Sequence, residues 1–115
     1  MPATNPNDLD EAEVAAEFLS AMANPKRLMI LNYLVKEEIA VGALANQVGL
    51  SQSALSQHLS KLRAQNLVST RRDAQTIYYS SSSQAVMKVL RTLTEIYGQE
   101  NKPESRAEDM KKRTA

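Results

Sequence analysis

A Gly-Leu-Ser sequence at residues 49–51, between two helical patterns, constrains the fold more than any other part of the chain. Gly49 suits the left-handed residue that ends a helix, because it has no Cβ to clash there. Ser51 is placed to cap the next helix by accepting a hydrogen bond from a free backbone N–H group. Leu50 is placed to fill the corner between them. This stretch therefore predicts two helices joined by a tight turn.

The second of these helices, predicted over residues 51–65, has an apolar and a polar face. Residues three and four positions apart share one face of a helix, and here they are Ala54, Leu55, His58, Leu59 and Leu62. The opposite face consists of Gln52, Ser53, Ser56, Gln57 and Ser60. A face that serves only solubility normally carries Lys and Glu, which favour helix more than Ser does. Because Ser and Gln are side chains that can read base edges in the major groove, the pattern predicts a helix-turn-helix with a DNA recognition helix.

Three helices are predicted before the recognition helix. The first covers residues 9–22 and has acidic residues in its N-terminal half, where the helix dipole favours them. Asn24 and Pro25 fit the N-cap and first residue of a second helix over residues 26–36. This second helix is apolar around most of its circumference, which is typical of a central position. Residues 41–48 form the first helix of the helix-turn-helix.

A hairpin and a final helix are predicted after it. Residues 67–72 and 76–80 are rich in residues that favour strands and flank a short turn, which is typical of the wing of a winged helix. Ile39 is predicted to form an isolated strand pair with this hairpin. The last helix runs over residues 83–97 and Gly98 ends it.

The length of 115 residues fits one compact domain, predicted over residues 9–98, with a disordered leader at 1–8 and a disordered charged tail at 99–115. The chain contains no cysteine, which excludes disulfides and zinc–thiolate sites. The sequence resembles neither a signal peptide nor a membrane span, so a cytoplasmic protein without a membrane partner is expected.

The net charge of +1 conceals an uneven distribution. Residues 1–20 contain five acidic and no basic residues, a net charge of −5. Residues 51–75 contain four basic residues and one acidic residue, a net charge of +3. Positive charge therefore collects around the predicted recognition helix and hairpin, which indicates a polyanionic partner at that face.

The order of four helices, a hairpin and a last helix resembles the ArsR family of bacterial winged-helix repressors over residues 11–97. The motifs that carry the resemblance are residues 24–31, Gly49-Leu50-Ser51-Gln52, Ser56-Gln57-His58-Leu59, Lys61-Leu62-Arg63 and Tyr78-Tyr79. Residues 18–28 and 49–83 resemble one member in particular. This resemblance implies a homodimer on an inverted repeat that represses nodulation and related genes.

The sequence departs from the wider family at two places. Metal-sensing members carry thiols and an acid in the first helix of the helix-turn-helix, but Glu38-Ile39 is followed here by Ala40-Val41-Gly42-Ala43. Residues 83–98 contain no His and one acid, so the last helix lacks the alternative ligand set. No metal and no cofactor is therefore expected. Ala74 stands at the hairpin tip where Gly is common, and a tight turn would strain Ala, so a longer or looser tip is expected.

The predicted DNA-binding residues lie on the recognition helix and the hairpin. They are Ser51, Gln52, Ser53, Ser56, Gln57, His58, Ser60, Lys61, Arg63, Arg71, Arg72, Gln75 and Thr76. The alternative is a solvated helix face and ordinary solubilising charges. Arg71 and Arg72 point to opposite faces of a strand, so only one of them is expected to meet DNA well.

His58, the single histidine, is expected to be partly buried and structural, or to touch a phosphate. Catalysis by a Ser56–His58 pair is not supported, because residues two positions apart point to different helix faces and no acid is set to orient the ring. The chain offers no catalytic residues and is not expected to be an enzyme.

The first and last helices each carry an apolar stripe. Both stripes could belong to the core of one chain, but so small a domain cannot fully cover both, which predicts a homodimer. The predicted interface residues are Val14, Phe18, Leu19, Met22, Val86, Val89, Leu90, Leu93, Ile96 and Tyr97. The competing hypothesis for the whole chain is a dimeric protein-interaction module on a winged-helix scaffold.

Overall fold

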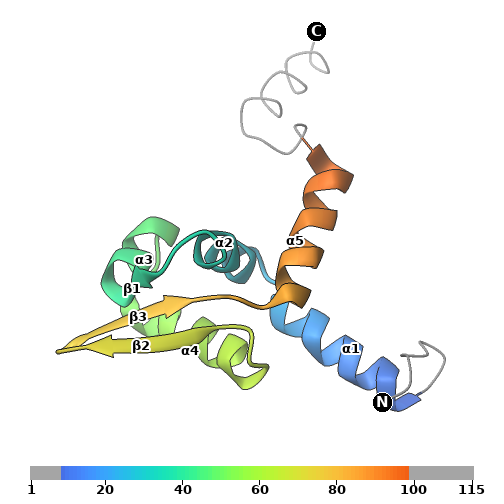
Figure 1. The fold of residues 1–115 in the computed structure, drawn as a ribbon, viewed down its shortest axis with the longest axis horizontal. Coiled ribbons are helices and arrows are strands. Elements are labelled where there is room, and N and C mark those ends of the chain that lie inside the picture. Colours follow the sequence, from blue (N-terminus) through green and yellow to red (C-terminus); the bar gives the residue numbers. More distant parts are fainter. Residues whose placement is uncertain (1–8, 99–115) are drawn as a thin grey trace, which may run out of the picture. The chain divides into compact units, whose positions relative to one another are not determined.

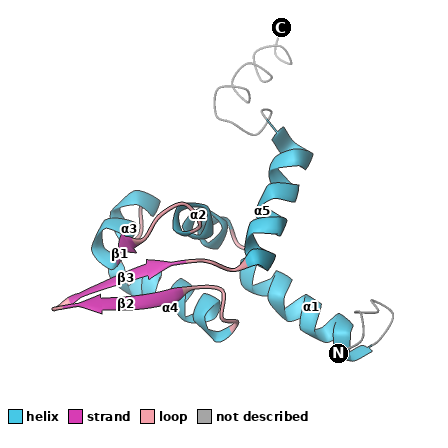
Figure 2. Cartoon of the chain, viewed as in Figure 1, coloured by secondary structure: helices cyan, strands magenta, loops and turns pink. Residues whose placement is uncertain are grey.

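The computed structural model describes residues 9–98, and the chain divides into two compact units, residues 1–83 and 84–115. The first unit contains, in chain order, α1 (Leu9–Met22), α2 (Pro25–Leu34), β1 (Ile39–Ala40), α3 (Val41–Val48), α4 (Gln52–Ala64), β2 (Ser69–Asp73) and β3 (Thr76–Ser80). The second contains α5 (Gln84–Tyr97). Figure 1 shows β2 and β3 extending from the helices of the first unit as a hairpin, and Figure 2 marks the same elements by type. The predicted winged helix-turn-helix is confirmed.

The start of α2 follows from its sequence as predicted. Asn24 is extended, with φ −159°, and its side-chain oxygen accepts hydrogen bonds from the backbone N–H groups of Lys26 at 2.9 Å and Arg27 at 3.1 Å. Pro25 takes the first helical position, where its missing N–H costs nothing. The helix then buries Ile30, Leu31 and Leu34 completely or nearly so. Because this face is buried, α2 holds Lys26 and Arg27 in fixed positions near its N-terminus.

The core of the first unit combines apolar side chains from every helix and from β1 and β3. Its buried apolar members are Ala21, Met22, Ile30, Leu31, Leu34, Ile39, Leu44, Ala45, Val48, Leu55, Leu59, Leu62, Leu67, Val68 and Tyr79. Helices α3 and α4 each bury three of these residues at helical spacing. Their relative orientation is therefore fixed by packing as well as by the turn.

The sheet has the order β1-β3-β2 and is antiparallel throughout. Ile39 lies opposite Tyr79, which confirms the predicted pairing of Ile39 with the hairpin. The last pair of the hairpin is Asp73 opposite Thr76, so a turn of only two residues, Ala74 and Gln75, joins the strands. Ala74 adopts a positive φ of 56°. The expectation of a longer or looser tip was therefore wrong, because the strand register continues to Asp73 and Ala74 accepts the strained conformation.

Helix α5 begins at Gln84, one residue later than predicted, and Gly98 follows it with a φ of 53°. Val86 and Leu90 are buried, whereas Ile96 and Tyr97 are exposed. The predicted leader and tail lie outside the described residues, so the prediction of their disorder stays a prediction. None of the helices in residues 9–98 has the length and apolar character needed to span a membrane.

Candidate nucleic-acid interface

The turn between α3 and α4 is held by backbone and side-chain bonds. Gly49 has a φ of 69°, and the N–H of Leu50 reaches back to the carbonyl of Ala45 at 2.9 Å, which satisfies one of the free carbonyls at the end of α3. The ammonium of Lys26 donates to the carbonyl of Val48 at 2.6 Å. A cation at this place also complements the negative end of the α3 dipole. The predicted role of Gly49 is confirmed, and the turn is tied to α2 as well.

Ser51 caps α4 as predicted. It is extended, with φ −67° and ψ 159°, and its hydroxyl accepts a hydrogen bond from the N–H of Ala54 at 3.2 Å. The hydroxyl of Ser53 lies 3.4 Å from that of Ser51. The N-terminal turn of α4 therefore presents hydroxyl groups that are already partly ordered.

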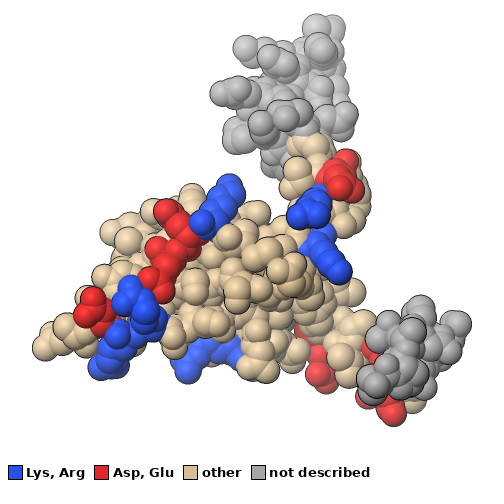
Figure 3. All heavy atoms as spheres, in the orientation of Figure 1, with Lys and Arg blue, Asp and Glu red and all other residues tan. Residues whose placement is uncertain are grey.

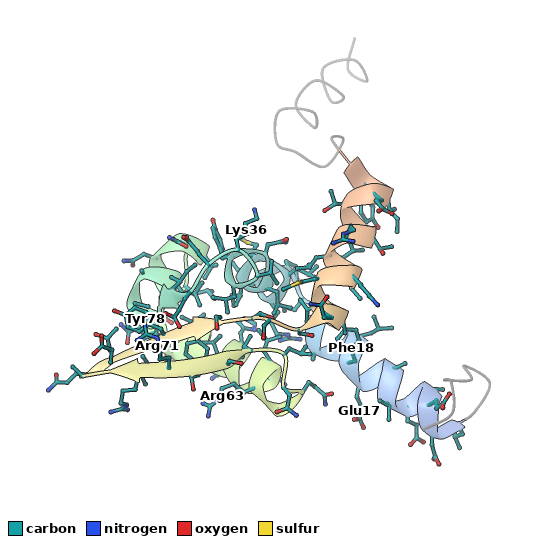
Figure 4. The ribbon with its side chains drawn as sticks, viewed as in Figure 1. Glu17, Phe18, Lys36, Arg63, Arg71 and Tyr78 are labelled. Atoms are coloured by element: carbon teal, nitrogen blue, oxygen red, sulfur yellow. The ribbon has the colours of Figure 1, made fainter. Side chains whose placement is uncertain are left out.

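The outward side of α4 is polar along its whole length. Its buried residues are Leu55, Leu59 and Leu62. The exposed residues that the sequence predicted as DNA contacts are Ser51, Gln52, Ser53, Ser56, Gln57, Ser60, Lys61 and Arg63. Arg63 follows Gln52 by three helical turns and projects from the C-terminal end of the helix (Figure 4). Uncharged hydrogen-bonding groups thus occupy the N-terminal part of the exposed face of α4, and Lys61 and Arg63 lie near its C-terminal end.

His58 is half-buried and is bound to α2. Its Nδ1 lies 3.2 Å from Nη1 of Arg27. Burial lowers the pKa of His58 below its ordinary value of 6.5, and the nearby charges of Arg27 and Lys61 lower this pKa further. A neutral ring that accepts the Arg27 N–H at Nδ1 carries its own proton at Nε2. His58 is therefore partly buried, as expected, and is neutral beside the polar face, whereas its contact with a DNA phosphate stays a prediction.

Arg27 belongs to one of the sequence motifs but was not predicted to form a specific bond. Its Nε donates to the carbonyl of Ala21 at 2.6 Å, and its Nη2 donates to the carbonyl of Ser20 at 3.4 Å. One guanidinium therefore connects the C-terminal carbonyls of α1 to His58 on α4. The only local signal for this role is a basic residue beside a helix N-cap, which is too common to predict a specific bond.

On the hairpin, Arg71 and Arg72 have different surroundings. The Nη2 and Nε of Arg71 donate to the carboxylate of Glu38 at 2.7 and 3.1 Å, and its guanidinium carbon lies 4.5 Å from the centre of the Tyr78 ring (Figure 4). The hydrogen bond from Arg71 lowers the pKa of Glu38, and Glu38 in turn raises the pKa of Arg71. Glu38 was not among the predicted residues, because it is separated from Arg71 by 33 positions.

The remaining hairpin residues predicted to bind DNA, Arg72, Gln75 and Thr76, are all exposed. In Figure 3, basic and acidic side chains lie next to each other over the hairpin, so this part of the molecule is not uniformly positive. Within residues 9–98, Arg72 forms neither a hydrogen bond nor an ion pair with another side chain. Its charge is therefore free to meet a phosphate.

The structure divides the predicted dimer residues into two groups. Met22, Val86 and Leu90 are buried in the single chain, at 2%, 0% and 7% exposure. No partner chain is present, so all ten residues stay a prediction as interface residues. The residues that stay accessible are Val14, Phe18, Leu19, Val89, Leu93, Ile96 and Tyr97. Among the described residues, no three His, Cys, Asp or Glu side chains form a group that could hold a metal ion.

Comparison with known proteins places this geometry in context. Residues 24–70 match the family model of bacterial regulatory proteins of the arsR family. The chain is 78% identical to the nodulation protein NolR of Rhizobium meliloti over 93 residues, which cover 81% of this chain and 76% of that protein. It is 46% identical to the transcriptional activator HlyU of Vibrio cholerae over 84% of this chain and 93% of that protein. The crystal structure of NolR from Sinorhizobium fredii matches with a TM-score of 0.78 at 78% identity, covering 85% of this chain and 98% of that one.

Proposed function

The chain belongs to the arsR family of bacterial regulatory proteins, and we propose that it is a homodimeric repressor that binds an inverted-repeat operator through α4. The family's helix-turn-helix makes it a DNA-binding transcriptional regulator. The 78% identity to a nodulation protein supports control of nodulation genes.

The observation that carries the proposal is the exposed surface of α4. The turn at Gly49 and the Ser51 cap fix where α4 begins. The hydrogen bond between Arg27 and His58 holds one side of α4 against α2, so the opposite side faces outward. Gln52 and Gln57 lie within the first two turns, where recognition helices contact base edges. A Gln side chain can bond in a bidentate manner to adenine, and each good pair contributes about 1–3 kcal/mol of discrimination.

A homodimer is supported by the accessible apolar residues of α1 and α5. Leu19 and Ile96 are 52% and 63% exposed, respectively. Large apolar side chains grouped on a helix face favour burial by a partner. A two-fold symmetric pair would place two recognition helices about 34 Å apart, which matches successive major grooves of an inverted repeat.

Selection of bound duplexes from a random pool tests the binding mode. We expect an enriched inverted repeat whose half-sites are about 10 base pairs apart from centre to centre. Gel shifts with this duplex and a scrambled one, at two salt concentrations, measure the specificity. Equal binding to both duplexes would contradict operator recognition.

The direction of regulation requires its own measurement, because a relative that is 46% identical is named an activator. In transcription reactions with purified polymerase, addition of the protein should lower the transcript from a promoter that overlaps the selected site. An increase in that transcript would contradict repression.

A further inference from the structure

We propose that Glu38, Arg71 and Tyr78 form a clamp that positions the hairpin, and that Arg72 is the cation of the hairpin that contacts DNA phosphate. The inference rests on the proposed DNA binding and assigns separate roles to two adjacent arginines. It also gives a role to Glu38, an acidic side chain close to a surface that should bind a polyanion.

The sheet register places the clamp on one face. Arg71 lies opposite Tyr78 across the hairpin, and the two side chains stack at 4.5 Å. Glu38 immediately precedes β1, whose Ala40 also pairs with Tyr78. Side chains two positions apart in a strand share a face. Glu38, Arg71 and Tyr78 therefore join all three strands through their side chains on the same side of the sheet.

The geometry of the ion pair favours a positioning role for Arg71. Two guanidinium nitrogens of Arg71 contact the Glu38 carboxylate. The ring of Tyr78, on β3, lies against the same guanidinium. An exposed ion pair contributes little unless its geometry is bidentate or several groups cooperate, and both conditions are met here. To meet a phosphate, Arg71 would have to leave these two partners, and Glu38 would then repel the same phosphate.

Arg72 has the opposite surroundings. It lies opposite Ile77 and shares its face with Tyr79, which is buried in the core. Arg72 therefore points to the side of the sheet on which the helices pack, but at the distal part of the hairpin, where its side chain is exposed. The distal turn contains only Ala74 and Gln75, so the short hairpin holds Arg72 close to its tip.

Four single variants, measured on the selected duplex over a range of salt concentrations, separate the roles. Arg72→Gln should flatten the slope of log affinity against log salt by about 0.9, the value for one lost phosphate contact. Arg71→Gln should leave this slope unchanged and weaken binding by about two- to fivefold, the range for loss of one exposed ion pair. Glu38→Gln should weaken binding like Arg71→Gln. Glu37→Gln, which removes the same charge one residue earlier, is the matched control and should not weaken binding.

A direct phosphate contact by Arg71 gives the reverse pattern. Arg71→Gln would then flatten the salt slope, and Glu38→Gln would strengthen binding more than Glu37→Gln does, because it frees a cation. Either result would overturn the assignment. The double variant Glu38→Gln/Arg71→Gln should bind no more weakly than either single variant if the two residues act as one unit.

Hydrogen exchange of the free protein tests the clamp independently of DNA. Glu38→Gln and Arg71→Gln should accelerate exchange of the amides that join β1 to β3 and β2 to β3, whereas Glu37→Gln should not. If exchange of these amides is unchanged in both variants, the proposed clamp is contradicted even if the protein binds DNA. If the unmodified chain binds no DNA, the proposed function fails, and the exchange result still decides whether the clamp exists.

Discussion

Nη1 of Arg27 on α2 lies 3.2 Å from Nδ1 of His58 on α4, so one hydrogen bond ties the predicted recognition helix to the second helix before it. The bond requires a neutral imidazole, because a protonated Nδ1 would present a hydrogen to a cation. Burial of His58, with the charges of Arg27 and Lys61, keeps its pKa below 6.5.

This bond predicts a dependence of stability on pH. In the unfolded chain the pKa of His58 should be about 6.5. In the folded chain this pKa is lower, so His58 takes up its proton only at lower pH. Between these two pKa values the unfolded state binds more protons, so the free energy of unfolding decreases as pH falls through this window. Above this pH window His58 is neutral in both the folded and the unfolded chain, and its contribution to the free energy of unfolding is fully present. Urea unfolding at pH 7.5, 6.5 and 5.5 measures the decrease, and His58→Gln should lose less stability than the unmodified chain between pH 7.5 and 5.5.

Gly49 provides a second prediction, about the turn. Its φ of 69° disfavours any residue with a Cβ, although a Cβ there would meet Lys26 Nζ only at an ordinary 3.8 Å. Gly49→Ala should therefore lower the free energy of unfolding by about 1 kcal/mol, through backbone strain alone. Gly42→Ala is the matched control. Gly42 lies within α3, its added Cβ would meet Gln52 Nε2 at 3.9 Å, and the change should stabilise the protein by about 0.5–1 kcal/mol.

The tip of the hairpin provides a third prediction. Ala74 is strained at a φ of 56°, and glycine adopts that region without penalty. Ala74→Gly should raise the free energy of unfolding by up to about 1 kcal/mol, despite the greater freedom of glycine in the unfolded chain. Ala43→Gly, on the exposed side of α3, should instead lower it by about 1 kcal/mol. Destabilisation by both changes would show that the conformation at Ala74 is not strained.

The sequence predicts the helix ends of this protein better than it predicts the tip of the hairpin. Gly49, Ser51 and Asn24 were predicted correctly because caps and helix ends depend on residues within a few positions. The tip was predicted wrongly, because its length depends on the register of the whole hairpin, and the pair Asp73–Thr76 outweighs the preference of one alanine.

The bonds that connect elements were not predictable for a similar reason. Arg27–His58 and Arg71–Glu38 join residues 31 and 33 positions apart, and neither pair leaves a local pattern in the sequence. The apolar stripes were recognised by their periodicity, but periodicity does not say which part of a stripe is covered. The predicted interface therefore includes both Met22, which the single chain buries, and Leu19, which it leaves 52% exposed.

A fourth prediction separates base contacts from phosphate contacts on α4. Gln57→Ala should weaken binding to the selected operator by about ten- to a hundredfold and leave binding to scrambled DNA nearly unchanged, since a bidentate base contact is worth about 1–3 kcal/mol. Lys61→Ala should weaken binding to both duplexes alike and flatten the salt slope by about 0.9. Gel shifts with the two duplexes at several salt concentrations measure both effects. Equal losses on both duplexes for Gln57→Ala would place this residue outside base recognition.

The last prediction concerns the apolar stripes. Leu19 is 52% exposed on α1 and Ile96 is 63% exposed on α5, so a single chain leaves most of each side chain unpacked. In a two-fold symmetric interface each substitution acts twice, and the burial of one such side chain contributes about 1.5–3 kcal/mol. Leu19→Lys or Ile96→Lys should therefore raise the dimer dissociation constant by on the order of a hundredfold or more.

Sedimentation equilibrium measures this change, with Met29→Lys as the control. Met29 is an exposed apolar residue of α2 outside both stripes, so the same charge there should leave the dissociation constant unchanged. Circular dichroism should show that all three variants keep their helices. If the unmodified chain sediments as a single subunit at micromolar concentration, or if all three variants remain dimeric, then neither α1 nor α5 forms the interface, and two recognition helices could not be spaced for an inverted repeat in the way proposed.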